Sequence, residues 1–192
     1  MIKTEVDYQI LVNGKNKVPS NWNDLIKLVS IKNALGEDIK VEEKAYNQYL
    51  LLKKELEENG IVIDIESSHR SIEDQEYIWK DYTERYGLEY TKKYAAVPGY
   101  SEHHTGLAID ICIRQGDKLI IENNDMMSHD EIFRYIHTFL TKYGFILRYP
   151  KGKEDITGYK YEPWHLRYVG DIAKDIMDNS LTLEEYLNKV EI

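Results

Sequence analysis

The chain has 192 residues, 42% of them hydrophobic, and a formal net charge of −9. This length suits one domain with a sizeable core, and we predict a single domain over residues 1–192. The negative charge argues against nucleic acid and anionic membranes as partners, because both would repel the protein. The single cysteine, Cys112, excludes an internal disulfide.

The N-terminal segment MIKTEVDYQILVNG contains two acidic residues and no apolar run of signal-peptide length. No stretch of the sequence approaches the roughly 18 to 20 apolar residues that cross a bilayer, so we expect no transmembrane segment. The expected location is cytoplasmic if Met1 is the native start. It is the cell envelope if a leader has been removed.

The first half of the chain predicts helices that alternate with a buried strand. Apolar side chains recur at helical spacing before Gly60, and an apolar run follows it. Ser71 and Asp74 form a capping-box pattern, which indicates a helix start. The predicted elements are a helix at 42–59, a strand at 61–66, a helix from Ser71 to about Gly87 and a short helix at 88–94.

The second half predicts short strands in hairpin-like succession. Capping-box patterns at Ser128 with Glu131, and at Thr182 with Glu185, indicate two further helix starts. With helices at either end, this order predicts an α+β fold with a small, largely antiparallel sheet. The predicted elements are strands at 107–113 and 118–122 around a Gly116–Asp117 turn, a helix at 128–144, strands at 145–149, 158–162 and 165–169, and two short helices at the end.

The histidines suggest a metal site. His103, His104 and His165 lie beside acids and turn residues, whereas His129 and His137 fall on a predicted helix and are expected at the surface. A catalytic zinc needs three protein ligands and one open position, and His103, Asp110 and His165 could supply the three. The residues alone leave two points open. Either of the adjacent histidines could be the ligand, and Asp110 could instead face solvent on an alternating strand.

Glu162 and Arg70 are candidates for the chemistry around such a metal. Pro163 favours an extended Glu162, so we expect the chain to turn before His165 and to carry both side chains toward one cleft. Arg70 follows a predicted strand, and its guanidinium suits a developing oxyanion or a substrate carboxylate. Each residue taken alone also fits an ordinary surface position.

Three segments together resemble the VanY-like zinc D-alanyl-D-alanine carboxypeptidases. They are SSHRSIEDQ, YSEHHTGLAIDI and YGFILRYPKGKEDITGYKYEPWHLRYVG, all within residues 60–170. The family also contains L,D-carboxypeptidases and VanXY-type bifunctional D,D-dipeptidase/carboxypeptidases. The resemblance implies an α+β fold in which helices pack on a small antiparallel sheet that carries the zinc, as in the D,D-peptidase and Hedgehog-like domains.

The resemblance also implies one zinc ion per chain, with His103, Asp110 and His165 as its ligands. Glu162 matches the catalytic base of the family. Arg70 matches the residue that stabilises the substrate oxyanion or carboxylate. The spacing of the family motif thus selects His103 over His104.

Two further positions match residues of the family's motifs. Ser101 matches a serine that contacts the substrate, and Gln75 matches the glutamine of the S-x-x-x-Q segment. The implied partner is a peptidoglycan precursor or muropeptide that ends in a D-amino acid. The implied reaction is removal of a C-terminal D-alanine, with cleavage of the free dipeptide or of an L,D bond as alternatives.

The sequence departs from the family at two positions. Position 104 is usually glutamine and the residue before Arg70 is usually tyrosine, whereas this chain has His104 and His69. No role is transferred to either histidine. A non-catalytic zinc-binding or peptidoglycan-binding module is a remote alternative, because the same fold also serves domains that signal. Glu162 and Arg70 together favour an enzyme.

Overall fold

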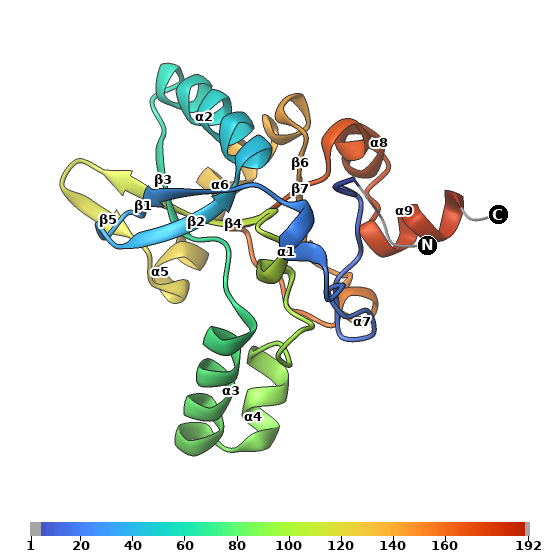
Figure 1. Ribbon diagram of the computed structural model, residues 1–192. Coiled ribbons are helices and arrows are strands. Elements are labelled where there is room, and N and C mark those ends of the chain that lie inside the picture. Colours follow the sequence, from blue (N-terminus) through green and yellow to red (C-terminus); the bar gives the residue numbers. More distant parts are fainter. Residues whose placement is uncertain (1–4, 191–192) are drawn as a thin grey trace.

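The computed structural model describes residues 5–190 (Figure 1). Its first elements are α1 (Trp22–Leu25), β1 (Leu28–Lys32), β2 (Asp38–Glu42), α2 (Glu43–Glu58), β3 (Val62–Ser67), α3 (Ile72–Tyr86) and α4 (Leu88–Tyr94). The central elements are the 3-10 helix η1 (Glu102–Thr105), β4 (Ala108–Gln115), β5 (Lys118–Ile120), α5 (Asn123–Ser128), α6 (Asp130–His137) and η2 (Leu140–Tyr143). The last are β6 (Phe145–Leu147), α7 (Glu154–Thr157), β7 (His165–Tyr168), η3 (Gly170–Ile172), α8 (Ala173–Asp178) and α9 (Leu183–Val190).

One five-stranded sheet organises the described chain. Its strand order is β3-β4-β7-β6, and β5 pairs with β4 as well. The strands β1 and β2 form a separate hairpin. Every pairing between these strands is antiparallel, which confirms the predicted α+β fold with a small antiparallel sheet.

The main core lies where α2 and α6 pack against the sheet (Figure 1). Leu52 of α2, Phe133 of α6 and Ile111 of β4 are fully buried in one apolar cluster. Burial of these side chains is the main favourable contribution to folding. Side chains along β4 point alternately toward the core and away from it. Asp110 points away from the core, so its carboxylate can contribute to a site on the other face of the sheet.

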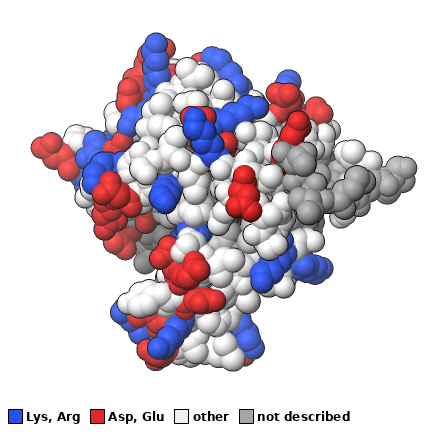
Figure 2. All heavy atoms as spheres, viewed as in Figure 1, with Lys and Arg blue, Asp and Glu red and all other residues white. Residues whose placement is uncertain are grey.

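Helices α3 and α4 form a hairpin that projects from the body of the molecule, at the bottom of Figure 1. The Ser71–Asp74 capping box opens α3 as predicted, with reciprocal hydrogen bonds between each side chain and the other residue's backbone. The two helices pack chiefly against each other. Across the face of the molecule shown in Figure 2, acidic and basic side chains are interspersed, and no basic patch dominates the view.

Most of the predicted elements are confirmed. The helix predicted at 42–59 is α2, the strand at 61–66 is β3, and the hairpin around Gly116–Asp117 is β4 with β5. The capping box predicted at Thr182 and Glu185 also forms, because the backbone N–H of each residue donates to the side chain of the other. No helix of the described residues is long and apolar enough to span a membrane.

Three predictions about local structure are wrong. Residues 158–162 form no strand, because the chain leaves α7 through a left-handed Gly158 and then approaches Pro163, which cannot donate to a ladder. The helix predicted at 128–144 is divided: α5 ends at Ser128, α6 begins at Asp130, and η2 follows. The hydroxyl of Ser128 donates backward to the Asp125 carbonyl and caps no following helix.

Candidate active site

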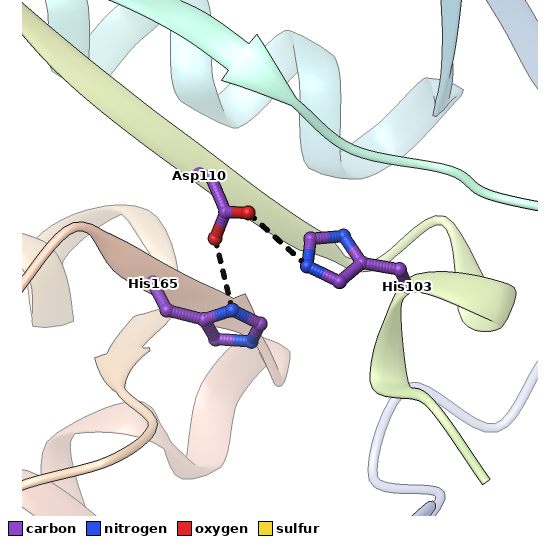
Figure 3. A group of neighbouring side chains, drawn as sticks. All are labelled: His103, Asp110 and His165. Atoms are coloured by element: carbon purple, nitrogen blue, oxygen red, sulfur yellow. Dashed lines mark ion pairs between the residues drawn. The ribbon is translucent and has the colours of Figure 1, made fainter. Parts of the chain in front are cut away.

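The sheet register brings two predicted zinc ligands together. Asp110 of β4 pairs directly with His165 of β7, so both side chains project from the same face. His103 reaches them from η1, which ends at Gly106 with a left-handed φ of 69°. A Cβ at Gly106 would also lie 2.9 Å from the Leu28 side chain, so this turn requires glycine. One ligand atom of each of the three residues lies within 4.8 Å of the others (Figure 3).

Each histidine is oriented by a hydrogen bond from its second ring nitrogen. His103 Nδ1 donates to the Ser68 carbonyl at 2.7 Å, and its Nε2 lies 3.2 Å from Asp110 Oδ2. His165 Nε2 donates to the Glu102 carboxylate at 3.2 Å, and its Nδ1 lies 2.9 Å from Asp110 Oδ1. When each ring is neutral, its unprotonated nitrogen therefore faces Asp110, which is the arrangement of metal-ligating histidines.

The environment of the Asp110 carboxylate indicates a metal site between the three residues. Its Oδ1 atom is buried and accepts no hydrogen bond from any described residue. A buried, unpaired carboxylate oxygen is costly, and a cation would compensate it. Two imidazole nitrogens and one carboxylate oxygen are ligands that suit Zn²⁺. All three residues line one cavity, so water or substrate has access to the group. The residues therefore fit a catalytic zinc.

The electrostatics of the group also favour a cation. Burial lowers the pKa of His165, but the Asp110 and Glu102 carboxylates outweigh burial and raise that pKa to about 10. Burial opposes ionisation of Asp110, yet the two histidines hold its pKa well below the usual range. Burial lowers the pKa of His103. A divalent metal would take the place of the proton on His165, as metal binding to histidine requires.

A turn places Glu162 beside the ligands. The His165 N–H donates to the Glu162 carbonyl at 3.2 Å across Pro163, which is the turn that the sequence predicts. Glu162 Oε2 lies 3.9 Å from His165 Nδ1. Burial raises the pKa of Glu162 to about 7.

The expectation of a surface His137 is wrong. This side chain is buried, and its Nε2 donates to the Pro163 carbonyl at 2.8 Å, which stabilises the turn before His165.

Arg70, Gln75 and Ser101 line the same cavity as Glu162 and the three ligands, with a volume of about 310 Å³. Arg70 Nη1 donates to Gln75 Oε1 at 2.8 Å, and Gln75 Nε2 donates to the Ala96 carbonyl at 2.8 Å. The buried glutamine thus fixes the guanidinium by one of its nitrogens. The remaining N–H groups of the guanidinium can donate to a carboxylate or an oxyanion.

His104 does not line this cavity. Its Nδ1 donates to the Arg70 carbonyl at 2.8 Å, and its Nε2 accepts from the Gly99 N–H at 3.0 Å. The backbone N–H of His69 donates to the Lys40 carbonyl at 2.9 Å. Both histidines line a second cavity of about 290 Å³, which shares Arg70 with the first. The two departures from the family pattern therefore line this second cavity and not the one that contains the three ligands.

A buried network of charges supports His165. Glu102 accepts from Arg148 Nε at 2.7 Å and from Arg167 Nη1 at 2.6 Å, in addition to its bond with His165. The side chains of Glu102 and both arginines are fully buried. Arg148 also forms two hydrogen bonds, of 2.7 and 2.9 Å, with Glu184 of α9. A buried charge is tolerable only when it is paired in this way.

Several cavity residues escaped the sequence analysis. Glu66 lies where the pairing of β3 with β4 shifts register, and such a bulge redirects a side chain in a way that alternation does not predict. Burial raises the pKa of Glu66 to about 7. Tyr149 and Tyr159 also line the cavity. Glu102 alone carried a sequence signal, because it directly precedes His103.

The comparisons with known proteins decide the family. A model described as VanY, D-alanyl-D-alanine carboxypeptidase, matches residues 38–171. The chain belongs to the VanY family. The putative carboxypeptidase YodJ of Bacillus subtilis is 38% identical over 187 residues, which cover 94% of this chain and 67% of YodJ. The chain spans about two thirds of the length of this and two further curated relatives.

Solved structures agree with the VanY assignment. The LdcB LD-carboxypeptidase is 36% identical with a TM-score of 0.77, over 93% of this chain and 85% of that one. A VanY D,D-pentapeptidase in complex with Zn(II) is 30% identical with a TM-score of 0.78, over 95% and 100% of the chains. The protein is accordingly a metallopeptidase of the D-alanyl-D-alanine carboxypeptidase family, with a His-Asp-His site.

The contact between Glu102 and His165 predicts a role in zinc affinity. Glu102→Gln should weaken zinc binding by about 10- to 100-fold, because the imidazole loses the carboxylate that orients it. Competition with a chromogenic chelator measures the affinity. Glu184→Gln is the matched control, since it disturbs Arg148 without contacting His165. Equal zinc affinities for the wild type and Glu102→Gln would contradict this role.

The hydrogen bonds of the adjacent histidines predict different effects of substitution. His103→Ala should lose zinc, whereas His104→Gln should keep zinc and activity, because an amide can both donate and accept. His104→Leu should keep zinc but lose about 1 to 3 kcal/mol of unfolding free energy, since two backbone groups lose their partner. Zinc content and urea unfolding measure these effects. Loss of zinc from His104→Gln alone would show that His104 is the ligand.

Proposed function

We propose that the protein removes a C-terminal D-alanine from peptidoglycan precursors or stem peptides, with one zinc ion per chain held by His103, Asp110 and His165. The observation that carries the proposal is the convergence of these residues with Glu162 and Arg70 in one cavity. A structural zinc site would be closed by a fourth protein ligand and would need no poised acid beside it. The arrangement therefore supports catalysis over a purely structural role.

When bound, zinc supplies Lewis-acid chemistry: it polarises a carbonyl and makes water more acidic. Glu162 is placed to accept the proton of the attacking water and to deliver it to the departing amine. Its half-buried position and raised pKa suit a group that both takes and gives a proton near neutral pH. The turn held by His137 keeps the carboxylate at the ligands without making it one of them.

Arg70 is the group that would recognise the anionic part of the substrate. The hydrogen bond with Gln75 fixes its orientation, and His104 fixes the backbone that carries it. A preorganised guanidinium can bind the C-terminal carboxylate or stabilise the oxyanion as negative charge develops. Ser101 lines the same cavity and offers a hydroxyl to the substrate.

The specificity within this chemistry is also part of the proposal. The relatives include D-alanyl-D-alanine carboxypeptidases, an L,D-carboxypeptidase and a bifunctional D-Ala-D-Ala dipeptidase and carboxypeptidase. We favour D-Ala-D-Ala cleavage because the matching family model carries that description. Dipeptidase and L,D-carboxypeptidase activities are the alternatives, since all three need the same ligands, base and cation.

The choice between these activities can be measured directly. Zinc-loaded protein is incubated with free D-Ala-D-Ala, a stem pentapeptide that ends in D-Ala-D-Ala, and the corresponding tetrapeptide. We expect release of one D-alanine from the pentapeptide as the fastest reaction. Preferred cleavage of the tetrapeptide would identify an L,D-carboxypeptidase, and preferred cleavage of the dipeptide a dipeptidase. Hydrolysis of none of the three would support a non-catalytic binding module.

The role of Glu162 makes a separate prediction. Glu162→Gln should lower kcat by at least about 100-fold, because the amide cannot accept the proton. Zinc content should not change, since Glu162 is not a ligand. Steady-state kinetics on the preferred substrate and metal analysis of the same sample provide the test. Glu131→Gln, on the surface of α6, is a matched control. Undiminished turnover in Glu162→Gln would refute the role.

A further inference from the structure

The α3/α4 hairpin carries a cluster of tyrosines that the catalytic chemistry does not use. Tyr82 and Tyr86 lie on α3, and Tyr90 and Tyr94 lie on α4. The ring centroids of Tyr94 and Tyr90 are 4.4 Å apart, and those of Tyr90 and Tyr86 are 4.8 Å apart. Tyr82 joins the cluster through Tyr86 at 5.8 Å and Tyr90 at 6.4 Å. These four residues are called the tyrosine cluster.

The tyrosine cluster is exposed to an extent that packing of the hairpin does not explain. Tyr86 is 55% exposed, Tyr90 42% and Tyr94 44%. Rings that only joined the two helices would be expected to bury most of their surface, since that burial is their contribution to stability. Contiguous exposed aromatic side chains usually mark a binding surface. The hairpin that carries these rings projects from the body of the molecule (Figure 1).

The tyrosine cluster is continuous with the catalytic cavity. Tyr82 and Tyr94 line the cavity that contains Arg70 and Glu162, whereas Tyr86 and Tyr90 lie beyond its rim. Lys160, two residues before Glu162, reaches across to Tyr94: its Nζ lies 3.3 Å from the phenol oxygen and 5.2 Å from the ring centroid. A substrate held by Arg70 therefore meets the tyrosine cluster as it leaves the cavity.

We propose that the tyrosine cluster is a subsite for the N-acetylated sugar of a muropeptide whose stem peptide lies in the catalytic cavity. The inference rests on the proposed function and extends it from the scissile bond to the glycan. Sugar rings present faces of C–H groups that pack on the negative face of an aromatic ring, and their hydroxyls can pair with phenol groups. Each tyrosine offers both kinds of contact.

Charge and distance favour the sugar over the peptide as the occupant. The acids beside the tyrosine cluster are paired with bases of the same helices, Glu84 with Lys80 at 3.9 Å and Glu89 with Lys92 at 3.0 Å. Because these charges cancel, the surface beside the rings suits a neutral sugar better than the carboxylates of a stem peptide. The four residues between the sugar and the scissile bond of a pentapeptide stem span at most about 14 Å when extended. A bound stem can therefore place its sugar just beyond the rim of the cavity.

The test compares two substrates that differ only in the sugar. KM and kcat are measured for a disaccharide pentapeptide and for the same pentapeptide without sugar, with the wild type, Tyr86→Ala and Tyr90→Ala. Each variant should raise KM for the disaccharide pentapeptide by about three- to tenfold, the effect of losing one aromatic contact. The kcat for that substrate and both constants for the sugar-free pentapeptide should stay unchanged.

Tyr77→Ala is the matched control. Tyr77 lies on the same helix α3, is 73% exposed and belongs to no described ring pair of the tyrosine cluster. It should leave both substrates unaffected. Tyr90→Phe, which keeps the ring, should retain most of the preference for the disaccharide substrate. Circular dichroism of each variant shows whether the hairpin helices remain folded.

A binding experiment separates failure of the subsite from failure of the proposed function. Saturation-transfer NMR with the Glu162→Gln protein and the free N-acetylated disaccharide should detect contact between the protein and the sugar. The same protein with Tyr86→Ala and Tyr90→Ala in addition should show no such contact. If the wild type hydrolyses neither substrate, the proposed function fails while the NMR result still decides on the sugar. If the tyrosine variants change KM equally for both substrates, the rings bind the peptide. If KM is unchanged and NMR detects no contact, the rings bind neither the peptide nor the sugar. Either result overturns the subsite.

Discussion

The pairing of Asp110 with His165 across two neighbouring strands is the constraint on which the site depends. Because β4 and β7 are antiparallel, directly opposed residues project from one face, and the opposite face of β4 is anchored in the main core. The carboxylate and the imidazole are therefore held by the backbone register and not by flexible loops. Only His103 comes from outside the sheet, and the tight turn at Gly106 delivers it.

This arrangement places carboxylates in the interior, and the rest of the structure compensates them. Arg148 and Arg167 neutralise Glu102, and Glu184 of α9 neutralises the second charge of the pair. The network connects the metal ligands to the C-terminal helix, far away in the sequence, and a further hydrogen bond from Asn13 to Glu184 adds the N-terminal segment. Segments outside the recognisable motifs thus contribute to the environment of His165, because a buried charge requires partners wherever the fold can supply them.

Local signals in the sequence predicted local structure well. The capping boxes at Ser71 and Thr182 form, and the chain turns at Pro163 as its restricted backbone requires. The capping-box pattern at Ser128 fails, since its hydroxyl finds a nearer acceptor in the preceding turn of α5. The strand predicted at 158–162 fails as well, because alternating side chains form no strand without a partner edge. The β1/β2 hairpin was missed because its side chains are only partly buried and give a weak apolar pattern.

The sequence by itself determined the α+β class, the family resemblance and the set of residues that the structure brings together, because motif spacing and chemical type are written in the chain. It did not distinguish the two adjacent histidines on physical grounds. In the tertiary structure His103 faces Asp110, whereas His104 forms a hydrogen bond with the Arg70 carbonyl. The two side chains differ in this way because successive side chains of a 3-10 turn point in different directions. The structure alone also supplied Glu102 as the partner of His165 and placed the tyrosine cluster beside the cavity. Both depend on contacts between segments that are distant in the sequence, and no local pattern encodes those contacts.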